Sequence, residues 1–353
     1  MRSNRRACVC LVGVLLLAAL GIPQGAGVDV LAGAAAAAAA PAKAGMVTDL
    51  TGLSGHGFND IAWEGFKKAQ SSLGVDVTLV ESREQADYEV NLKKLASEGH
   101  NVVVGVGFLL TDAIVKAASE FPGAKFALID SVPDTIPGNL RCYVFREEEG
   151  SFLVGFLAGK MTKTGKVGFV GGMDSPLIRK FEAGFRAGVM TASPKVKVSA
   201  AYVGSFTDPA KGKQIADMMY NSGADIVYQA AGESGLGVID AVKARPDGFY
   251  AVGVDMDQDS LAPGKVLTSM VKRVDTACFA AIEDTVRGRF TSGVVSLGIK
   301  EGGIGLSEMR YTKSKVPAQV MAELEKYSNA LRDGKFKVPT SLDELAKFKA
   351  PAF

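Results

Sequence analysis

The residues best placed for chemistry in this 353-residue sequence are polar and aromatic side chains near the ends of predicted β-strands. Asp49 ends the first β-rich run, and a glycine-rich loop then leads to the pair Phe58-Asn59 at the head of a predicted helix. Asn59 suits that first turn because a short polar side chain can cap free backbone N–H groups. We interpret Phe58, a large ring in a glycine-rich loop, as a surface for a flat ligand. The alternative is a hydrophobic staple that packs back onto the helix.

The same kind of residue follows the later predicted strands. This set comprises Gly107-Phe108, Asp130, Phe206, Gly232, Asp255 and Lys272. In open α/β sheets ligands bind outside the carboxyl ends of the strands, so these residues would meet in one cleft. Aromatic faces there would stack on a planar ring, carboxylates would accept hydrogen bonds from hydroxyl or ring N–H groups, and glycine would allow close backbone approach. A single Asp at a strand end is more often a helix cap, and only the whole set favours a ligand site.

Composition excludes several other classes of function. The chain is 47% hydrophobic and 22% charged, which is typical of soluble globular proteins, and its net charge of +2 gives no case for nucleic-acid binding. The two histidines, His56 and His100, lie in unrelated segments, which argues against a histidine-based metal site. We therefore predict no metal and no cofactor.

The N-terminal segment has the layout of a secretory signal peptide. Arg2, Arg5 and Arg6 precede an apolar run, Val9–Leu20, that is too short to span a membrane comfortably. We assign residues 1–43 to this leader and exclude them from the fold. No cysteine follows the apolar run as a lipid anchor would require, so we expect export to the periplasm as a soluble protein and not as a lipoprotein.

Two cysteines remain after the leader, Cys142 and Cys278. They could form a disulfide in an oxidising compartment, or they could be two buried free thiols. The sequence leaves both alternatives open.

Strand-like and helix-like segments alternate along the rest of the chain. The predicted strands are 45–48, 75–80, 101–106, 125–129, 140–145, 167–170, 196–203, 226–229, 250–254, 266–270 and 294–299, and the predicted helices are 61–73, 84–98, 112–120, 150–161, 177–192, 209–221, 236–244, 275–287, 317–333 and 341–348. Strands separated by helices of this length predict parallel sheets built from βαβ units. The order predicts an α/β protein of two doubly wound lobes, joined by a three-strand hinge near Phe145, Lys272 and Leu297.

Several runs in this sequence resemble the basic membrane protein family, and specifically its purine nucleoside receptor A branch. These runs include TDLTGLSGHGFNDIAWEG, GVGFLLTDAI, EEEGSFLVGFLAG, VGSFTDPAKGKQIADMMYNSGADIVYQAAG, GVDMDQ and VLTSMVKRVD, and the resemblance covers nearly all of residues 45–310. The resemblance implies a type I periplasmic-binding fold that captures purine nucleosides for an inner-membrane ABC permease and its ATPase. We expect a monomer and no enzymatic activity. The expected lobes are 44–146 with 274–297, and 147–273 with 298–353.

The resemblance also implies roles for the strand-end residues. Phe58 and Phe206 would sandwich the base, while Asn59 and Asp130 would bind its polar edge with Asp49 nearby. Asp255 and Lys272 would hold the ribose hydroxyls and would neutralise each other in the empty cleft, and backbone at Gly232 would close over the sugar. Two residues depart from the family pattern, His56 and Glu233. They are either solvated rim residues, the interpretation that we favour, or residues that change the ligand.

Three alternatives remain. Ser269-x-x-Lys272 and Lys163-Thr164-Gly165 match parts of the serine β-lactamase signature, but in the wrong order and with the serine in a strand-like run. The same fold could bind another aromatic ligand, such as riboflavin. The liganded protein could also contact a sensory receptor instead of a permease.

Overall fold

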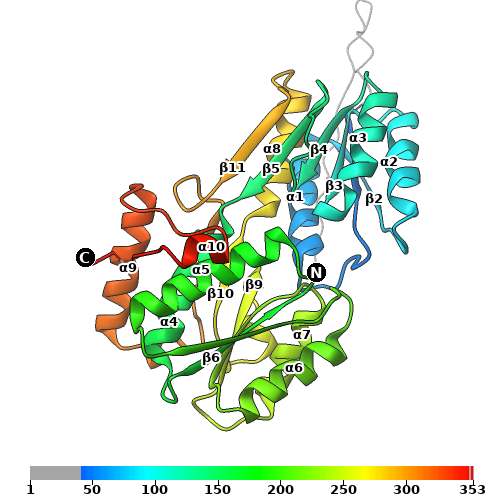
Figure 1. The fold of residues 1–353 in the computed structure, drawn as a ribbon. Helices are drawn as coiled ribbons and strands as arrows, with labels where there is room; N and C mark the ends of the chain where they lie inside the picture. Colours follow the sequence, from blue (N-terminus) through cyan, green and yellow to red (C-terminus); the bar gives the residue numbers. More distant parts are fainter. Residues whose placement is uncertain (1–40, 350, 353) are drawn as a thin grey trace, which may run out of the picture. The chain divides into compact units, whose positions relative to one another are not determined.

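The computed structural model describes residues 41–349, 351 and 352 (Figure 1). The predicted signal peptide lies almost wholly outside these residues. Its end remains a prediction: strand β1 (Lys43–Val47) begins at the last residue assigned to the leader, and the Lys43 amide donates to Asn101 Oδ1 at 2.8 Å. Among the described residues, no helix is long and apolar enough to cross a membrane.

The first of two six-stranded sheets in the described residues is entirely parallel, with the order β11-β5-β4-β3-β1-β2. Its strands are β1, β2 (Asp76–Val80), β3 (Val102–Val106), β4 (Lys125–Ile129), β5 (Leu140–Phe145) and β11 (Gly293–Leu297). Side chains alternate between its faces: Val102 and Val104 pack with α1 (Phe58–Leu73) and α8 (Val274–Val286), and Val103 packs with α2 (Asp87–Ser97) and α3 (Thr111–Glu120). Both faces are therefore covered, as Figure 1 shows.

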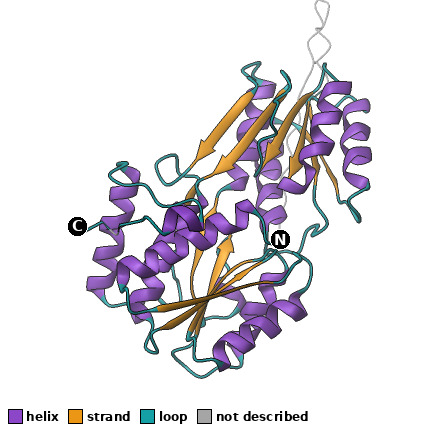
Figure 2. Cartoon of the chain, viewed as in Figure 1, coloured by secondary structure: helices purple, strands orange, loops and turns teal. Residues whose placement is uncertain are grey.

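The second sheet has the order β12-β10-β9-β8-β6-β7 and is parallel except for β12. Its strands are β6 (Lys166–Gly171), β7 (Lys197–Tyr202), β8 (Ile226–Ala230), β9 (Tyr250–Asp255), β10 (Val266–Lys272) and β12 (Ile304–Leu306). Helices α4 (Glu147–Met161) and α5 (Pro176–Ala192) cover one face, and α6 (Pro209–Asn221) and α7 (Ser234–Lys243) cover the other (Figure 2). Two further helices, α9 (Ala318–Arg332) and α10 (Leu342–Leu345), pack against α4 and α5 respectively.

The α/β class with two parallel-dominated sheets is confirmed. Within the described residues, the chain passes between the sheets three times, after β5, β10 and β11. The domain boundaries given above remain a prediction. Strand β12 was not predicted, because three residues carry too little pattern to distinguish a strand from a loop. Helix α4 begins at Glu147 and not at the predicted residue 150, because a run of three glutamates reads as polar loop although acidic residues favour a helix N-terminus.

The two remaining cysteines are free and buried. Cys142 lies in β5 and Cys278 in α8, and burial raises the pKa of the Cys142 thiol to about 11 and that of Cys278 further still. The choice left open by the sequence is settled in favour of free thiols, which are inert at neutral pH.

Helices α4 and α5 approach each other through glycines. A Cβ atom on Gly188 would lie 2.0 Å from the Phe152 carbonyl oxygen, and one on Gly155 would lie 2.1 Å from the Phe185 carbonyl oxygen. Neither backbone can move without displacing a whole helix, so this contact requires glycine.

We therefore expect Gly188→Ala to lower the free energy of unfolding by about 1–3 kcal/mol, the usual cost of overpacking. The matched control is Gly123→Ala, because a Cβ atom there meets nothing within 4 Å. Urea unfolding of both variants measures the effect. Equal midpoints would show that the two helices can separate without cost.

Candidate ligand-binding site

A small cavity, with a volume of about 60 Å³, lies where elements from the two sheets meet. It is lined by Asp49, Thr51, Phe58, Gly107, Phe108, Asp130, Leu177, Ile178, Phe181, Phe206, Ala230, Gly232, Val254, Asp255 and Lys272. Seven of the eight residues predicted for the site are in this set. The exception is Asn59.

Asn59 lies behind the cavity and orders the loop in front of it. Its Nδ2 donates to Asp49 Oδ1 at 2.8 Å, to Thr51 Oγ1 at 2.7 Å and to the Gly52 carbonyl at 3.0 Å. Asp49 Oδ1 also accepts from the Thr51 amide at 3.0 Å. The amide nitrogen is thus fully used in holding Asp49 and the loop, whereas Asn59 Oδ1 is buried without a hydrogen-bond partner among the described residues. The predicted contact between Asn59 and a base stays a prediction and would have to use this oxygen.

Four phenylalanines line the cavity from different elements. Phe58 starts α1, Phe108 follows β3, Phe181 belongs to α5, and Phe206 follows β7. The rings of Phe108 and Phe206 meet edge to face, with centroids 6.1 Å apart. Phe206 is also fixed from behind, because a Cβ atom on Gly172 would lie 2.3 Å from its ring. The strand-end pattern in the sequence includes Phe108, without a role, but not Phe181, which lies within a helix.

Asp130 and Asp255 hold corresponding positions at the carboxyl ends of β4 and β9. Both have left-handed backbone, with φ of 71° and 65°. This region is rare for residues other than glycine, and aspartate tolerates it better than most. Residues in this unfavourable conformation are more frequent at functional sites, where the surrounding structure holds them in place. Here it turns the two carboxylates into the cavity.

Lys272 is almost completely buried at the end of β10 and is surrounded by carboxylates. Its Nζ lies 2.5 Å from Asp130 Oδ2 and 3.0 Å from Glu147 Oε1. Among the described residues the contact ion pairs of Lys272 go to Asp130 and Glu147, and the expected neutralisation between Lys272 and Asp255 acts through their charges without such a contact. Sequence order could not reveal this, because Asp130 and Lys272 come from strands of different sheets.

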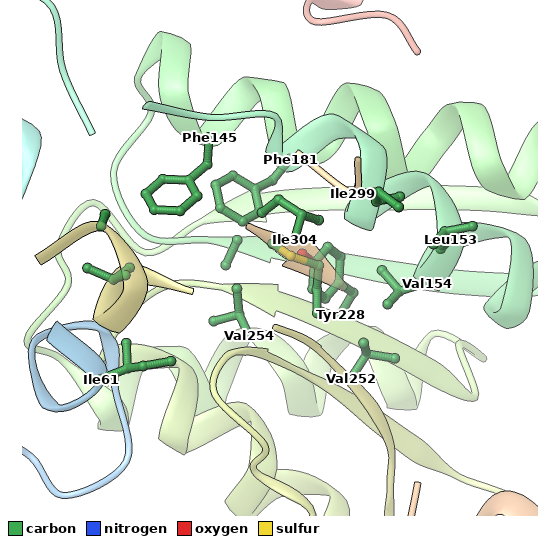
Figure 3. Packing of buried hydrophobic residues seen from close by; sticks show 14 of the residues in the cluster. Ile61, Phe145, Leu153, Val154, Phe181, Tyr228, Val252, Val254, Ile299 and Ile304 are labelled. Carbon is green, nitrogen blue, oxygen red and sulfur yellow. The ribbon is translucent and has the colours of Figure 1, made fainter. Parts of the chain in front are cut away.

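Aromatic rings complete the surroundings of the Lys272 ammonium. Its Nζ lies 5.1 Å from the ring centre of Phe58, 5.0 Å from that of Phe145 and 5.7 Å from that of Phe181. Figure 3 shows Phe145 and Phe181 within the buried hydrophobic cluster. Cation–π contacts of this kind add to the ion pairs where water is excluded.

Glu147 is a further residue of the site that the sequence pattern did not predict. This fully buried carboxylate at the start of α4 also pairs with Lys180 of α5, at 2.6 Å from Lys180 Nζ to Glu147 Oε2. Lys180 Nζ in turn donates to the Phe145 carbonyl at 2.8 Å. Its signal in the sequence was the run of three glutamates directly after a predicted strand.

The buried charges shift one another's pKa values. Burial raises the pKa of Asp130 to about 6 and that of Asp255 to about 7, although Lys272 acts against the rise in both. Burial also opposes the ionisation of Glu147, but Lys272 and Lys180 outweigh it and lower the pKa of Glu147. For Lys272, burial is outweighed by Asp130, Glu147 and Asp255, and its pKa is raised. The cavity thus holds a permanent cation beside carboxylates that titrate near neutral pH.

His56 is exposed and Glu233 is half-buried, and neither lines the cavity. Their interpretation as rim residues fits these positions. Among the described residues, no group of three or more His, Cys, Asp or Glu side chains is arranged to hold a metal ion.

Comparison with known proteins identifies the family of this chain. A family model described as "ABC transporter substrate-binding protein PnrA-like" matches residues 42–340. The chain is 36% identical to a protein of Lactococcus lactis named "ABC transporter nucleoside-binding protein BmpA", over 84% of this chain and 89% of that protein. It is 33% identical to basic membrane protein A of Borreliella burgdorferi, over 87% of this chain and 90% of the relative.

Solved structures agree with this assignment. A solute-binding protein of an ABC transporter system from Aeropyrum pernix superposes with a TM-score of 0.80 at 31% identity, covering 87% of this chain and 96% of the other. An arabinose-binding protein from Geobacillus stearothermophilus, at 16% identity and a TM-score of 0.60, shares the fold alone. The type I periplasmic-binding fold implied by the sequence is confirmed. The chain therefore belongs to the PnrA-like family of ABC transporter substrate-binding proteins.

Proposed function

We propose that this protein captures purine nucleosides in the cavity and delivers them to an ABC permease and its ATPase in the inner membrane. The observation that carries the proposal is the pairing of aromatic rings with a buried group of carboxylates around one lysine. Phe58, Phe108 and Phe206 would bind the flat base. Asp255 and Lys272 would bind the ribose, whose hydroxyls both donate and accept hydrogen bonds.

The charge of the cavity favours nucleosides over nucleotides. Lys272 is the only cationic residue among the described residues that line it, and Asp130 and Glu147 already neutralise it. A phosphate would meet Asp49, Asp130 and Asp255 with no free cation to bind. Burying an unpaired charge costs several kcal/mol, so phosphorylated ligands should be rejected.

The proposal includes export of the protein to the periplasm, based on the predicted signal peptide, and function as a monomer. Bound ligand would contact residues from both sheets, and its binding would favour the closed arrangement of the two lobes that the permease recognises. The lobe boundaries near residues 146, 273 and 297 are part of this proposal.

Isothermal titration tests the ligand class. Protein that has been unfolded, dialysed and refolded to remove co-purified ligand is titrated with inosine, guanosine, adenosine, cytidine, inosine monophosphate and riboflavin. We expect tight binding of the purine nucleosides and none of the monophosphate. Tight binding of riboflavin alone would favour the alternative aromatic ligand, and binding of none of these compounds would refute the proposal.

Two substitutions test the site itself. Phe206→Ala removes a ring that closes the cavity, and Asp255→Ala removes the proposed ribose acceptor. We expect each to weaken purine nucleoside binding at least tenfold, which corresponds to about 1.4 kcal/mol. The matched control is Phe290→Ala, because Phe290 contacts Lys125 and Arg141 outside the cavity. Full affinity in both cavity variants would refute the site assignment.

A further inference from the structure

A buried glutamine links the two sheets without lining the cavity. Gln258 follows β9, is 2% exposed, and donates from Nε2 to the His56 carbonyl at 2.8 Å. His56 lies in the glycine-rich loop that leads to Phe58 at the start of α1. One hydrogen bond therefore joins the second sheet to the loop that brings the Phe58 ring to the cavity, and within the first sheet Asp60 holds the Gly55 and Gly57 amides of the same loop.

The orientation of the Gln258 amide is determined by its neighbours. Its Oε1 accepts from the Val254 backbone amide at 3.2 Å and from Gln229 Nε2 at 2.9 Å. Gln229 is oriented in the same way, since its Oε1 accepts from the Ala231 backbone amide at 3.1 Å. A backbone N–H can only donate, so turning over either side-chain amide would set donor against donor.

These bonds form a relay with one direction. It runs from the Ala231 amide through Gln229 and Gln258 to the His56 carbonyl, and all its side-chain atoms are buried. Ala231 is the neighbour of Gly232, which lines the cavity. The relay thus joins a cavity-lining turn of the second sheet to the loop of the first sheet that carries Phe58. Buried chains of hydrogen bonds strengthen one another, because each is polarised by the next.

Glycines make room for the relay. A Cβ atom on Gly235 would lie 1.9 Å from Gln229 Oε1, and one on Gly253 would lie 2.7 Å from Gln258 Oε1. Contacts within the second sheet therefore hold the two glutamine side chains in one conformation, independently of the bond to the first sheet. Because the Gln258 side chain is already held, its amide loses little conformational entropy when it forms the hydrogen bond to the His56 carbonyl.

We infer that Gln258, supported by Gln229, is a positioning residue that sets ligand affinity by holding the glycine-rich loop and Phe58 in the closed arrangement. The two glutamines lie outside the cavity-lining set, so they act equally on every ligand that requires Phe58. When the sheets separate, the bond to His56 is lost and the Gln258 donor must be rehydrated. The relay therefore favours closure even in the empty protein. The ligand-binding part of this inference rests on the proposed function, and the conformational part does not.

Gln258→Glu is the most specific test. The new carboxylate still accepts from Val254 and Gln229, but it cannot donate to the His56 carbonyl and repels it. Gln258→Met is the second variant, which removes the donor without adding a charge and decides the question if the glutamate variant does not fold. The matched control is Gln214→Glu, at an exposed position of α6.

The first measurement needs no ligand. Spin labels are attached at two exposed positions, Lys94→Cys in α2 beside the first sheet and Lys243→Cys in α7 beside the second. Double electron–electron resonance then measures the distance between the two labels. We expect the empty protein to populate the closed distance, and Gln258→Glu and Gln258→Met to lose that population while Gln214→Glu retains it. Unchanged distances in the Gln258 variants, or no closed population in the unsubstituted protein, would overturn the inference whatever the ligand is.

The second measurement uses stopped-flow binding of whichever ligand the titration identifies. We expect dissociation about tenfold faster in the Gln258 variants with little change in association, and unchanged ratios of affinity among inosine, guanosine and adenosine. A changed ratio would mean that Gln258 contacts the ligand, which also overturns the inference. Failure of every nucleoside to bind would refute the proposed function and leave the distance measurement to decide on the relay.

Discussion

Replacement of Lys272 by methionine is expected to lower the free energy of unfolding by about 3–5 kcal/mol at pH 8, the cost of breaking a buried ion pair. The ammonium lies 2.5 Å from Asp130 Oδ2 and 3.0 Å from Glu147 Oε1, and all three groups are buried. Without it, two carboxylates remain in a low-dielectric site, and among the described residues the cation at contact distance is then Lys180, beside Glu147. They can relieve this strain only by taking up protons.

The cost should therefore depend on pH. The pKa of Asp130 is already raised to about 6 in the folded protein, and loss of Lys272 raises it further. A carboxyl group whose pKa is higher in the folded than in the unfolded protein stabilises the folded state while it is protonated at low pH. This stabilisation is lost as pH rises through the folded-state pKa. We expect the loss in Lys272→Met to be clearly smaller at pH 5.5 than at pH 8.

Urea unfolding at both pH values measures this effect, with two comparisons. Lys67→Met removes a half-exposed ion pair with Glu64 and should change stability by less than about 1 kcal/mol. The double variant Lys272→Met with Asp130→Asn should recover part of the loss, because it removes one of the two stranded carboxylates. A loss that is the same at both pH values, or no recovery, would contradict the role given to this ion pair.

The affinity for purine nucleosides should fall steeply below neutral pH. Burial raises the pKa of Asp255 to about 7, with Lys272 acting against the rise and Asp130 and Glu147 adding to it. Only the ionised carboxylate accepts two hydrogen bonds from ribose hydroxyls, so binding competes with the proton. We expect affinity to be constant above about pH 8 and to fall about tenfold per unit below 7, giving about 100-fold weaker binding at pH 5.

Titration calorimetry with inosine between pH 5 and 8.5 checks this dependence. In Asp255→Asn the affinity should be low and much less dependent on pH, because the acceptor that titrates near 7 is gone. In the unsubstituted protein, binding at pH 6.5 should also release a proton, which is seen as a dependence of the measured enthalpy on the buffer. Affinity that stays constant down to pH 5 would exclude Asp255 as the ribose acceptor.

Local sequence was sufficient for the elements and for most of the cavity lining. Strands β4 and β5 match their predicted bounds, since short β-rich runs between turn residues have few other readings. Asp130 and Asp255 were found because each directly follows such a run, and parallel strands bring their carboxyl ends to one edge. The family resemblance supplied the roles that local pattern could not.

The errors arose where the outcome depends on contacts between the sheets. Lys272 could pair with any carboxylate at the cleft, and its choice of Asp130 and Glu147 over Asp255 depends on which strand ends the two sheets bring together. Asn59 follows Phe58 directly in the chain, but its amide nitrogen is committed to Asp49, a contact that the sequence does not reveal. Glu147 was overlooked because its partner Lys180 lies 33 residues away in the chain.

The sequence by itself determined the alternation of strands and helices, the family, and the side chains that gather at the strand ends, because these depend on local periodicity and on a general rule of parallel sheets. Only the tertiary structure decided how the charges pair, which amides face the cavity, and that Gln229 and Gln258 join the two sheets. Those features depend on distances of a few ångströms between residues far apart in the chain, and on burial, which multiplies the strength of each charge and hydrogen bond.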